Sequence, residues 1–486
     1  MKATLALAGL TAWATASLPA VDPLSAVRTH VAVLADEAMA GREAATPNYE
    51  RAADYVVARF RASGLKPYPG IGWRQRVPLI ALAPAGPGHA VVTRDGKLVL
   101  LNPDDIALSL PVRPSDEHVS GVVVAAGHCV VDREAGIDDF AGLDLRGKIA
   151  ACRAGAPAAL PPAARTLHGD PEEQARAAST RGAIGIVIIQ SAGQAESTSF
   201  VRIARAWRAP RLALNEPSGE GRILGLFSAS AASRFLAGAG AVSLTIDSPG
   251  RREARSGSNV IGWLAGSDRR LKSEMVVVSA HLDHLGDNIA PAVGSTDRIA
   301  NGALDNAIGV ATMMEIARRL ARAPRKPARG IVFVAFTAEE QGLLGSRWFV
   351  RHIPAMRRKP IANVNIDMPI LTYKLADLLL RGTGWAALPG AAWIESRIGL
   401  PITQEIGIAP ASDNRSFARV GVPTYVPLPG EAGGGLAALR RFKAEHYHRG
   451  SDDLSLAIDW ESADTYATFV QLLTVCFANG CTAAEP

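Results

Sequence analysis

Residues 275–286, with the sequence MVVVSAHLDHLG, change abruptly from apolar to polar character. The apolar, partly β-branched first half predicts a strand buried on both faces, and the polar second half predicts a loop at its carboxyl end. The same pattern recurs at residues 331–340 and 361–367, where the apolar runs end in acidic residues. Strands of this kind, separated by long helical segments, are typical of a parallel sheet with helices on both faces.

This alternation continues from residue 258 to the end of the chain and predicts the fold class. We expect an α/β protein whose main domain has three αβα layers around a mostly parallel mixed sheet. Ligands of such sheets bind beyond the carboxyl ends of the strands, so functional residues are expected there. The expected strands are 275–280, 331–337, 361–368 and 424–427, and the expected helices are two within 23–65, then 306–323, 341–352 and 460–477.

The 486 residues are too many for one simple core, which favours two domains or one large domain with an insertion. Residues 105–250 form the candidate insertion, because short strands and a helix at 170–181 replace the long alternation. Their titratable residues form no cluster with evident chemistry. The predicted division is a leader at 1–20, a first part of the main domain at 21–104, the insertion at 105–250 and a second part of the main domain at 251–486.

The first 20 residues resemble a secretory signal peptide, because Lys2 precedes an apolar run and small residues end at Ala20. This predicts a secreted or periplasmic protein without stable membrane insertion. Four cysteines permit two disulfides in an exported chain. The local pair Cys476/Cys481 is plausible, whereas Cys129 and Cys152 lie in apolar strand-like segments and could equally be free core thiols.

The formal net charge of +6 comes from Lys and Arg residues that are scattered along the chain, often as short pairs. They are not interleaved with aromatic residues in one stretch, as a nucleic-acid surface would favour. This distribution predicts a solvated basic surface and no nucleic-acid partner.

Polar residues at the expected strand ends supply candidate metal ligands. Converging carboxylates require a cation, and imidazole with carboxylate suits zinc, with manganese or cobalt as substitutes. Two ions need a bridging carboxylate, for which Asp305 lies suitably before a helix. One acid of the Glu339-Glu340 pair would be a ligand and the other a general base. Asp283 would accept the other N–H of the His281 ring. The full candidate set is His281, Asp283, Asp305, Glu339, Glu340, Asp367, His446 and His448.

These residues resemble the co-catalytic zinc exopeptidase family that contains bacterial leucyl aminopeptidases and glutamate carboxypeptidase II. The resemblance implies the zinc-exopeptidase (phosphorylase/hydrolase-like) fold. The sequence departs from the family pattern at Ile308, Pro369 and Asn414. These differences leave the substrate pocket and any role of Asp413 undefined. The motifs are HLDHLG at 281–286, GALDNA at 302–307, FTAEEQGLLGS at 336–346, NIDM at 365–368 and YH at 447–448.

The resemblance also implies a role for each site residue. One zinc ion would be held by His281 and Asp367, a second by Glu340 and His448, and Asp305 would bridge them. Glu339 would be the general base, and Tyr447 would contact the scissile carbonyl. The family pattern favours His448 over His446 as the ligand, because it follows the tyrosine directly. The Asp305–Asn306 peptide bond is expected to be cis.

Two segments outside these motifs extend the resemblance. Residues 34–42 resemble the N-terminal part of the catalytic domain. Residues 138–149 and 181–186 resemble the protease-associated domain that some members carry as an insertion, a β-rich α+β module.

The leading functional hypothesis is a zinc aminopeptidase that acts on peptides with a free N-terminus. A carboxypeptidase or dipeptidase is the main alternative, with Arg415 as a candidate anchor for a terminal carboxylate. Glutaminyl cyclase shares the fold but typically uses one zinc ion. A non-catalytic binding protein, similar to the transferrin receptor's use of this fold, belongs to a different class, and the intact ligand set argues against it.

Overall fold

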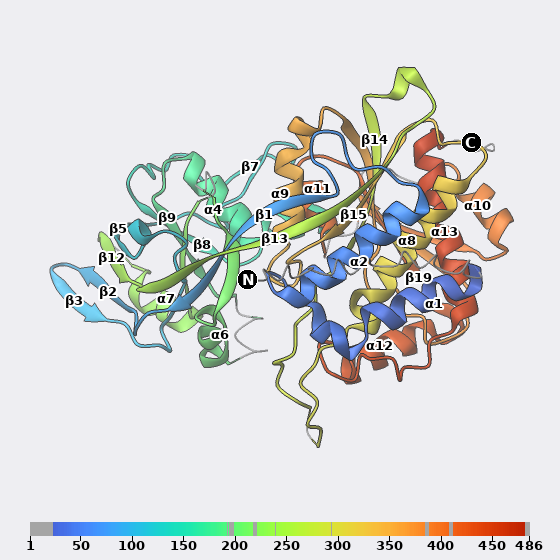
Figure 1. The fold of residues 1–486 in the computed structure, drawn as a ribbon. Coiled ribbons are helices and arrows are strands. Elements are labelled where there is room, and N and C mark those ends of the chain that lie inside the picture. Colours follow the sequence, from blue (N-terminus) through green and yellow to red (C-terminus); the bar gives the residue numbers. More distant parts are fainter. Residues whose placement is uncertain are drawn as a thin grey trace, which may run out of the picture.

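The computed structural model describes residues 23–481, apart from 192, 194–198, 217–220, 239, 293, 384–387 and 408–411. Helices and strands form two lobes, each built around its own sheet (Figure 1). The predicted leader at 1–20 lies outside the described residues. Within the described part of the chain, no helix is both long enough and apolar enough to span a bilayer.

The larger lobe is built on a mixed sheet that is parallel at its centre. Parallel pairs join β15, β14, β16 and β19, and also β17 and β18, whereas the remaining neighbours are antiparallel. In spatial order, the strands described are β10 (Arg211–Leu214), β1 (Arg74–Pro84), β13 (Gly250–Leu264), β15 (Gly330–Phe336), β14 (Glu274–His281), β16 (Lys359–Asn365), β19 (Thr424–Pro429), β17 (Leu378–Thr383) and β18 (Ile402–Ile406).

Helices cover both faces of this sheet. Successive residues of a strand point to opposite faces, so Val276 and Met275 of β14 belong to different hydrophobic cores. The predicted three-layer αβα arrangement is therefore confirmed. The Val276 side is covered by α1 (Pro23–Leu34), α2 (Pro47–Ser63), α8 (Ile308–Arg322) and α13 (Trp460–Asn479), and the Met275 side by α9 (Leu344–His352) and α11 (Asn414–Arg419).

The smaller lobe contains the second sheet. The predicted boundary at residue 105 falls inside this sheet, because β2 pairs with β12 and brings residues 89–100 into the smaller lobe. β10 also contradicts the predicted division. It lies within residues 105–250, which were assigned to the insertion, but it pairs with β1 of the larger sheet. The strands in order are β3 (Lys97–Leu100), β2 (His89–Arg94), β12 (Val242–Asp247), β5 (His118–Ala125), β8 (Ile149–Arg153), β9 (Gly185–Ile189), β11 (Ile223–Phe227) and β4 (Ile106–Leu108).

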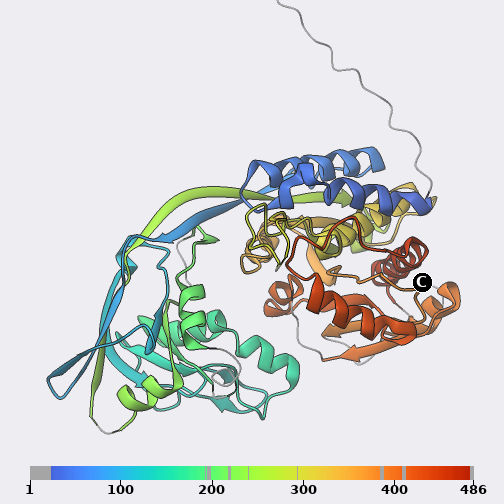
Figure 2. The same cartoon turned by 90° about the horizontal axis from the view of Figure 1, so that it is seen from below.

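A long antiparallel ribbon made of β1 and β13 joins the two lobes (Figure 2). Its register runs from Arg74 opposite Val260 in the larger lobe to Pro84 opposite Gly250 next to the smaller one. The ribbon therefore belongs to the larger sheet at one end and leads into the smaller lobe at the other.

Both cysteine pairs are disulfide-bonded. Cys129 is joined to Cys152 in the smaller lobe, and Cys476 at the end of α13 is joined to Cys481. The alternative that Cys129 and Cys152 are free core thiols is therefore wrong. The prediction placed both cysteines in strands. Cys129 instead lies in the loop after β5, where its φ is 56°, and it faces the neighbouring strand β8 that contains Cys152.

The N-terminal segment is attached to the larger lobe through a buried arginine. Arg42 ends the short helix η1 (Glu37–Arg42) and is 1% exposed. Its guanidinium donates to the carbonyl oxygens of Leu282 (3.0 Å), Asn301 (2.6 Å) and Gly302 (3.1 Å), and also to that of Leu34. Because Leu282 follows β14 and Gly302 precedes α8, one side chain connects three separate parts of the chain.

Replacing Arg42 with methionine should remove this connection and leave several buried carbonyl groups without a donor. We expect the free energy of unfolding to fall by about 3–5 kcal/mol, because each unsatisfied buried group costs about 1–3 kcal/mol. Denaturant unfolding of the two proteins measures the difference. The exposed Arg269→Met variant is the control, and a similarly small effect in both variants would show that the buried contacts of Arg42 do not stabilise the fold.

Candidate metal centre

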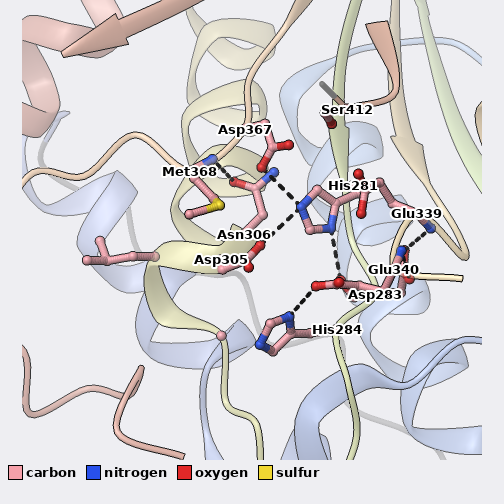
Figure 3. Close-up of polar contacts among 12 residues, drawn as sticks. His281, Asp283, His284, Asp305, Asn306, Glu339, Glu340, Asp367, Met368 and Ser412 are labelled. Carbon is pink, nitrogen blue, oxygen red and sulfur yellow. Dashed lines mark hydrogen bonds and ion pairs between the residues drawn. The ribbon is translucent and has the colours of Figure 1, made fainter. Parts of the chain in front are cut away.

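The centre forms where three parallel strands end side by side. His281 is the last residue of β14, Glu339-Glu340 follow β15, and Asp367 follows β16. Because β15, β14 and β16 are parallel neighbours, their carboxyl ends lie at one edge of the sheet. Figure 3 shows how the side chains at this edge surround one volume: His281, Glu339, Glu340 and Asp367, together with Asp305.

Asp305 lies between two sets of side chains. Its Oδ1 is 3.3 Å from His281 Nε2, which is also 3.2 Å from Asp367 Oδ1. Its Oδ2 is 3.5 Å from His448 Nε2, which in turn is 3.3 Å from Glu340 Oε2. The five predicted ligands therefore form two groups, with one oxygen of Asp305 facing each group.

The loop that contains Asp305 is fixed by hydrogen bonds from both sides. The Asp305–Asn306 peptide bond is cis. The carboxylate of Asp452 accepts from the backbone N–H of Leu304 (2.8 Å) and of Asp305 (3.0 Å). On the other side, Asn306 donates to Ile366 O (2.9 Å) and accepts from the N–H of Met368 (3.3 Å). The loop is thus attached to the segment that bears Asp367.

Asp283 does not have the predicted partner. Its main-chain carbonyl oxygen, rather than its carboxylate, is 3.0 Å from His281 Nδ1. The carboxylate instead accepts from the backbone N–H groups of Glu339 (3.0 Å) and Glu340 (3.3 Å). Because the chain turns at Leu282, the carbonyl of Asp283 reaches the ring while its side chain points toward the end of β15. The imidazole is still oriented by residue 283, and the same residue also fixes the glutamate pair.

Three residues of the centre had no predicted role. His284 Nδ1 is 2.7 Å from Glu340 Oε1, so it orients the second oxygen of that carboxylate. Asp452 and Arg42 hold the surrounding loops. His284 could have been identified, since a second histidine three residues after His281 must lie in the same loop. Arg42 and Asp452 give no such signal, because their contacts are with main-chain atoms far away in sequence.

The two histidines near the C-terminus point to different surroundings. His446 Nδ1 is 3.1 Å from both the carbonyl and the hydroxyl oxygen of Ser451. His448 faces Asp305 and Glu340, with its ring centroid 3.8 Å from that of Tyr447 in a stacked arrangement. Tyr447 is 38% exposed and lies beside the centre.

The nearby carboxylates raise the pKa of the His281 and His448 imidazoles and so favour their protonated, positively charged form. Burial alone would lower the pKa of His281, but Asp367 and Glu339 raise it well above its usual value. Burial also opposes protonation of His448, yet hydrogen bonds with Asp305 and Glu340 raise its pKa to about 9. A cation placed between these groups would take over the role of both protons.

The surroundings of Glu339 and Asp413, in contrast, favour the neutral form of each side chain. Burial and the nearby negative charge of Asp367 raise the pKa of Glu339 well above its usual value. Burial likewise raises the pKa of Asp413 to about 7, and its side chain is fully buried. Neither carboxyl faces an imidazole in an ion pair among the described residues. Glu339 is therefore a proton-accepting group whose affinity for a proton is high.

The donor set fits a borderline transition metal. His281, Asp305 and Glu340 offer one nitrogen and two oxygen atoms that all lie within 4.8 Å of one another. Imidazole and carboxylate together are the ligands that zinc prefers in sites that keep an open position. The donors therefore fit the zinc ion expected from the sequence.

Comparison with known proteins agrees with this chemistry. Residues 259–474 match the model of Peptidase family M28. Over 159 residues the chain is 32% identical to Aminopeptidase YwaD of Bacillus subtilis (strain 168), which covers 32% of this chain and 30% of that protein. Over 138 residues it is 29% identical to Aminopeptidase NAALADL1 of Mus musculus, which covers 27% of this chain and 16% of that protein. The matches therefore span less than a third of these relatives.

A solved structure extends the likeness over both lobes. The aminopeptidase from Aneurinibacillus sp. strain AM-1 aligns over 95% of this chain and 96% of its own, with a TM-score of 0.51 and 19% identity. At this identity the likeness shows the fold alone. The family match includes all the predicted ligands and Glu339. Residues 259–474 thus match the model of Peptidase family M28, in agreement with the co-catalytic zinc exopeptidase family that the motifs resemble.

Proposed function

We propose that this protein is an exported zinc aminopeptidase that removes N-terminal residues from peptides with two metal ions. The division of Asp305 between two ligand groups supports the count of two. One ion would be held by His281, Asp367 and Asp305 Oδ1, and the other by His448, Glu340 and Asp305 Oδ2. The names of two matched relatives, Aminopeptidase NAALADL1 and Aminopeptidase YwaD, favour an exopeptidase that acts at the N-terminus.

When bound, the metal ions would polarise the scissile carbonyl and lower the pKa of a water molecule between them. Glu339 is the residue suited to accept the proton of that water and to deliver it to the leaving amine. It is not one of the ligands in either group, and Asp283 fixes its backbone N–H at 3.0 Å. Tyr447 lies beside His448 with an exposed edge, where its hydroxyl is suited to contact the substrate carbonyl.

The carboxypeptidase alternative gains no support from Arg415. Its guanidinium is 3.0 Å from Asp170 Oδ2 of the smaller lobe, and Arg419 contacts the same carboxylate at 2.8 Å. Arg415 is thus engaged between the lobes. An aminopeptidase needs no such cation, because the α-amine of its substrate is positive and suits the acidic centre.

Export and the nature of the smaller lobe belong to the same proposal. The two disulfides and the leader-like first 20 residues favour an oxidising compartment. The β-rich smaller lobe, with residues 138–149 and 181–186 in it, is consistent with a protease-associated domain. Fractionation of the producing cells and the N-terminal sequence of the mature protein test the export.

Metal analysis tests the number of ions. We expect about two zinc ions per chain, loss of activity on chelation and recovery on adding zinc back. Asp305→Ala should reduce bound zinc most strongly, because Asp305 alone faces both groups. A protein that binds one ion with full activity would contradict the proposed two-metal centre.

Substitution of Glu339 separates the base from the ligands. Glu339→Gln should lower kcat by about 10²–10⁴-fold, because an amide cannot accept the proton, while zinc content stays unchanged. The matched variant Glu340→Gln alters a proposed ligand and should lower zinc content. If Glu339→Gln kept the wild-type kcat, Glu339 would not be the general base.

A blocked N-terminus tests the direction of cleavage. Leucyl peptides with a free amine should be hydrolysed, whereas the N-acetylated peptides of the same sequence should be resistant, because the acetyl group removes the positive amine. Product analysis by mass spectrometry reports which end is shortened. Release of the C-terminal residue from the acetylated peptide would favour a carboxypeptidase instead.

A further inference from the structure

Two hollows of very different size are lined by residues that directly follow proposed metal ligands in the sequence. On the Asp367 side, a cavity of about 40 Å³ begins at Met368 and is closed mainly by apolar residues. On the Glu340 side, an open groove of about 950 Å³ is lined by Gln341 and Glu43. Gln341 follows Glu340 directly, and Glu43 forms a β-bridge with His284, which contacts Glu340. The groove therefore starts at the residues that adjoin one end of the centre.

The floor of the groove is the part of the β1–β13 ribbon that runs toward the smaller lobe. Arg251, Glu253 and Arg255 of β13 line it. They are alternate residues, so their side chains lie on one face of the strand. Arg255 lies four positions before Asn259, whose Oδ1 accepts from the N–H of Thr337 (3.2 Å), two residues before the glutamate pair. The arginines are thus spaced along the ribbon at about 13 Å intervals from this point.

The groove has more positive than negative charge. Arg255 forms an ion pair with Glu253, and Arg252 forms one with Glu117 at 2.6 Å. Arg211 is bonded to the carbonyl oxygens of Trp207 (3.1 Å) and Leu110 (2.9 Å) and to a serine hydroxyl, so no carboxylate neutralises it among the described residues. The guanidinium of Arg251 is exposed and has no ion-pair or hydrogen-bond partner in the described part of the chain. Glu43 is the acid on the opposite wall.

We propose that this groove receives the downstream part of a peptide substrate and selects peptides that present a carboxylate to Arg251. The inference rests on the proposed aminopeptidase function. The groove is much larger than the cavity that begins at Met368, so it is the hollow in which several downstream residues of a peptide fit. An extended peptide advances about 3.3 Å per residue, which places Arg255 and Arg251 within reach of residues well downstream of the scissile bond.

A carboxylate is the group that suits Arg251 best. The planar guanidinium matches the two oxygens of a carboxylate, and its free donors need no other ion pair to be broken. The partner carboxylate is either an acidic side chain or the C-terminus of the peptide. Because the site is exposed, salt should weaken the preference.

Kinetics on matched peptides test the proposal. The substrates are leucyl peptides of about eight residues, in which one asparagine at a time, from the second position onward, is replaced by aspartate, each with a free or an amidated C-terminus. We expect aspartate at one or two downstream positions to raise kcat/KM by about two- to fivefold over asparagine at low salt, the range of an exposed ion pair. The ratio should approach one in about 0.5 M NaCl. A gain that is lost on amidation would identify the C-terminal carboxylate as the partner.

Variants connect the preference to the groove. Arg251→Gln should bring the aspartate-to-asparagine ratio close to one, and Arg251→Glu should reverse it. Arg269→Gln removes an exposed arginine outside the groove and should keep the wild-type ratio. If the protein cleaves leucyl-p-nitroanilide but shows no aspartate preference, or if Arg251→Glu keeps it, the groove proposal is wrong while the aminopeptidase stands. If no aminoacyl substrate is cleaved, the proposed function itself is wrong.

Discussion

Repulsion between carboxylates that are forced together at one edge of a sheet governs the structure of the centre. Asp305, Glu339, Glu340 and Asp367 meet there because parallel strands end side by side and a loop brings Asp305 between them. Such a group is stable only with compensating positive charge. In the protein alone, His281 and His448 supply it by holding protons above their usual pKa. The need for a cation is thus built into the topology of the sheet.

The parts of this arrangement that follow from sequence are those set by local pattern. Apolar runs such as 275–280 predict buried strands, and the residues after them must lie at one edge if the strands are parallel. That reasoning places His281, Glu340 and Asp367 together. It needs the family resemblance for His448, which comes from a loop after helix α12 (Gly435–Glu445) rather than from a strand end.

Other features could not be predicted because they depend on contacts with main-chain atoms or on pairing between distant strands. The carboxylate of Asp283 holds two backbone N–H groups instead of an imidazole. Arg42 contacts four carbonyls that no sequence spacing indicates. The start of the smaller lobe was placed too late, because the alternation in β2 looks the same whichever sheet it joins. Strands β17 and β18 at the far edge of the larger sheet were not predicted.

The path of the chain between the lobes has a further consequence. It leaves the larger sheet after β1, returns to it for β10, leaves again for β11 and β12, and comes back in β13. The smaller lobe is therefore not formed by one continuous segment inserted between β1 and β13. Deleting it would also take away the strand that covers the outer edge of β1, and an uncovered edge invites association with other chains. Recombination that exchanges such lobes among relatives would have to preserve this returning strand.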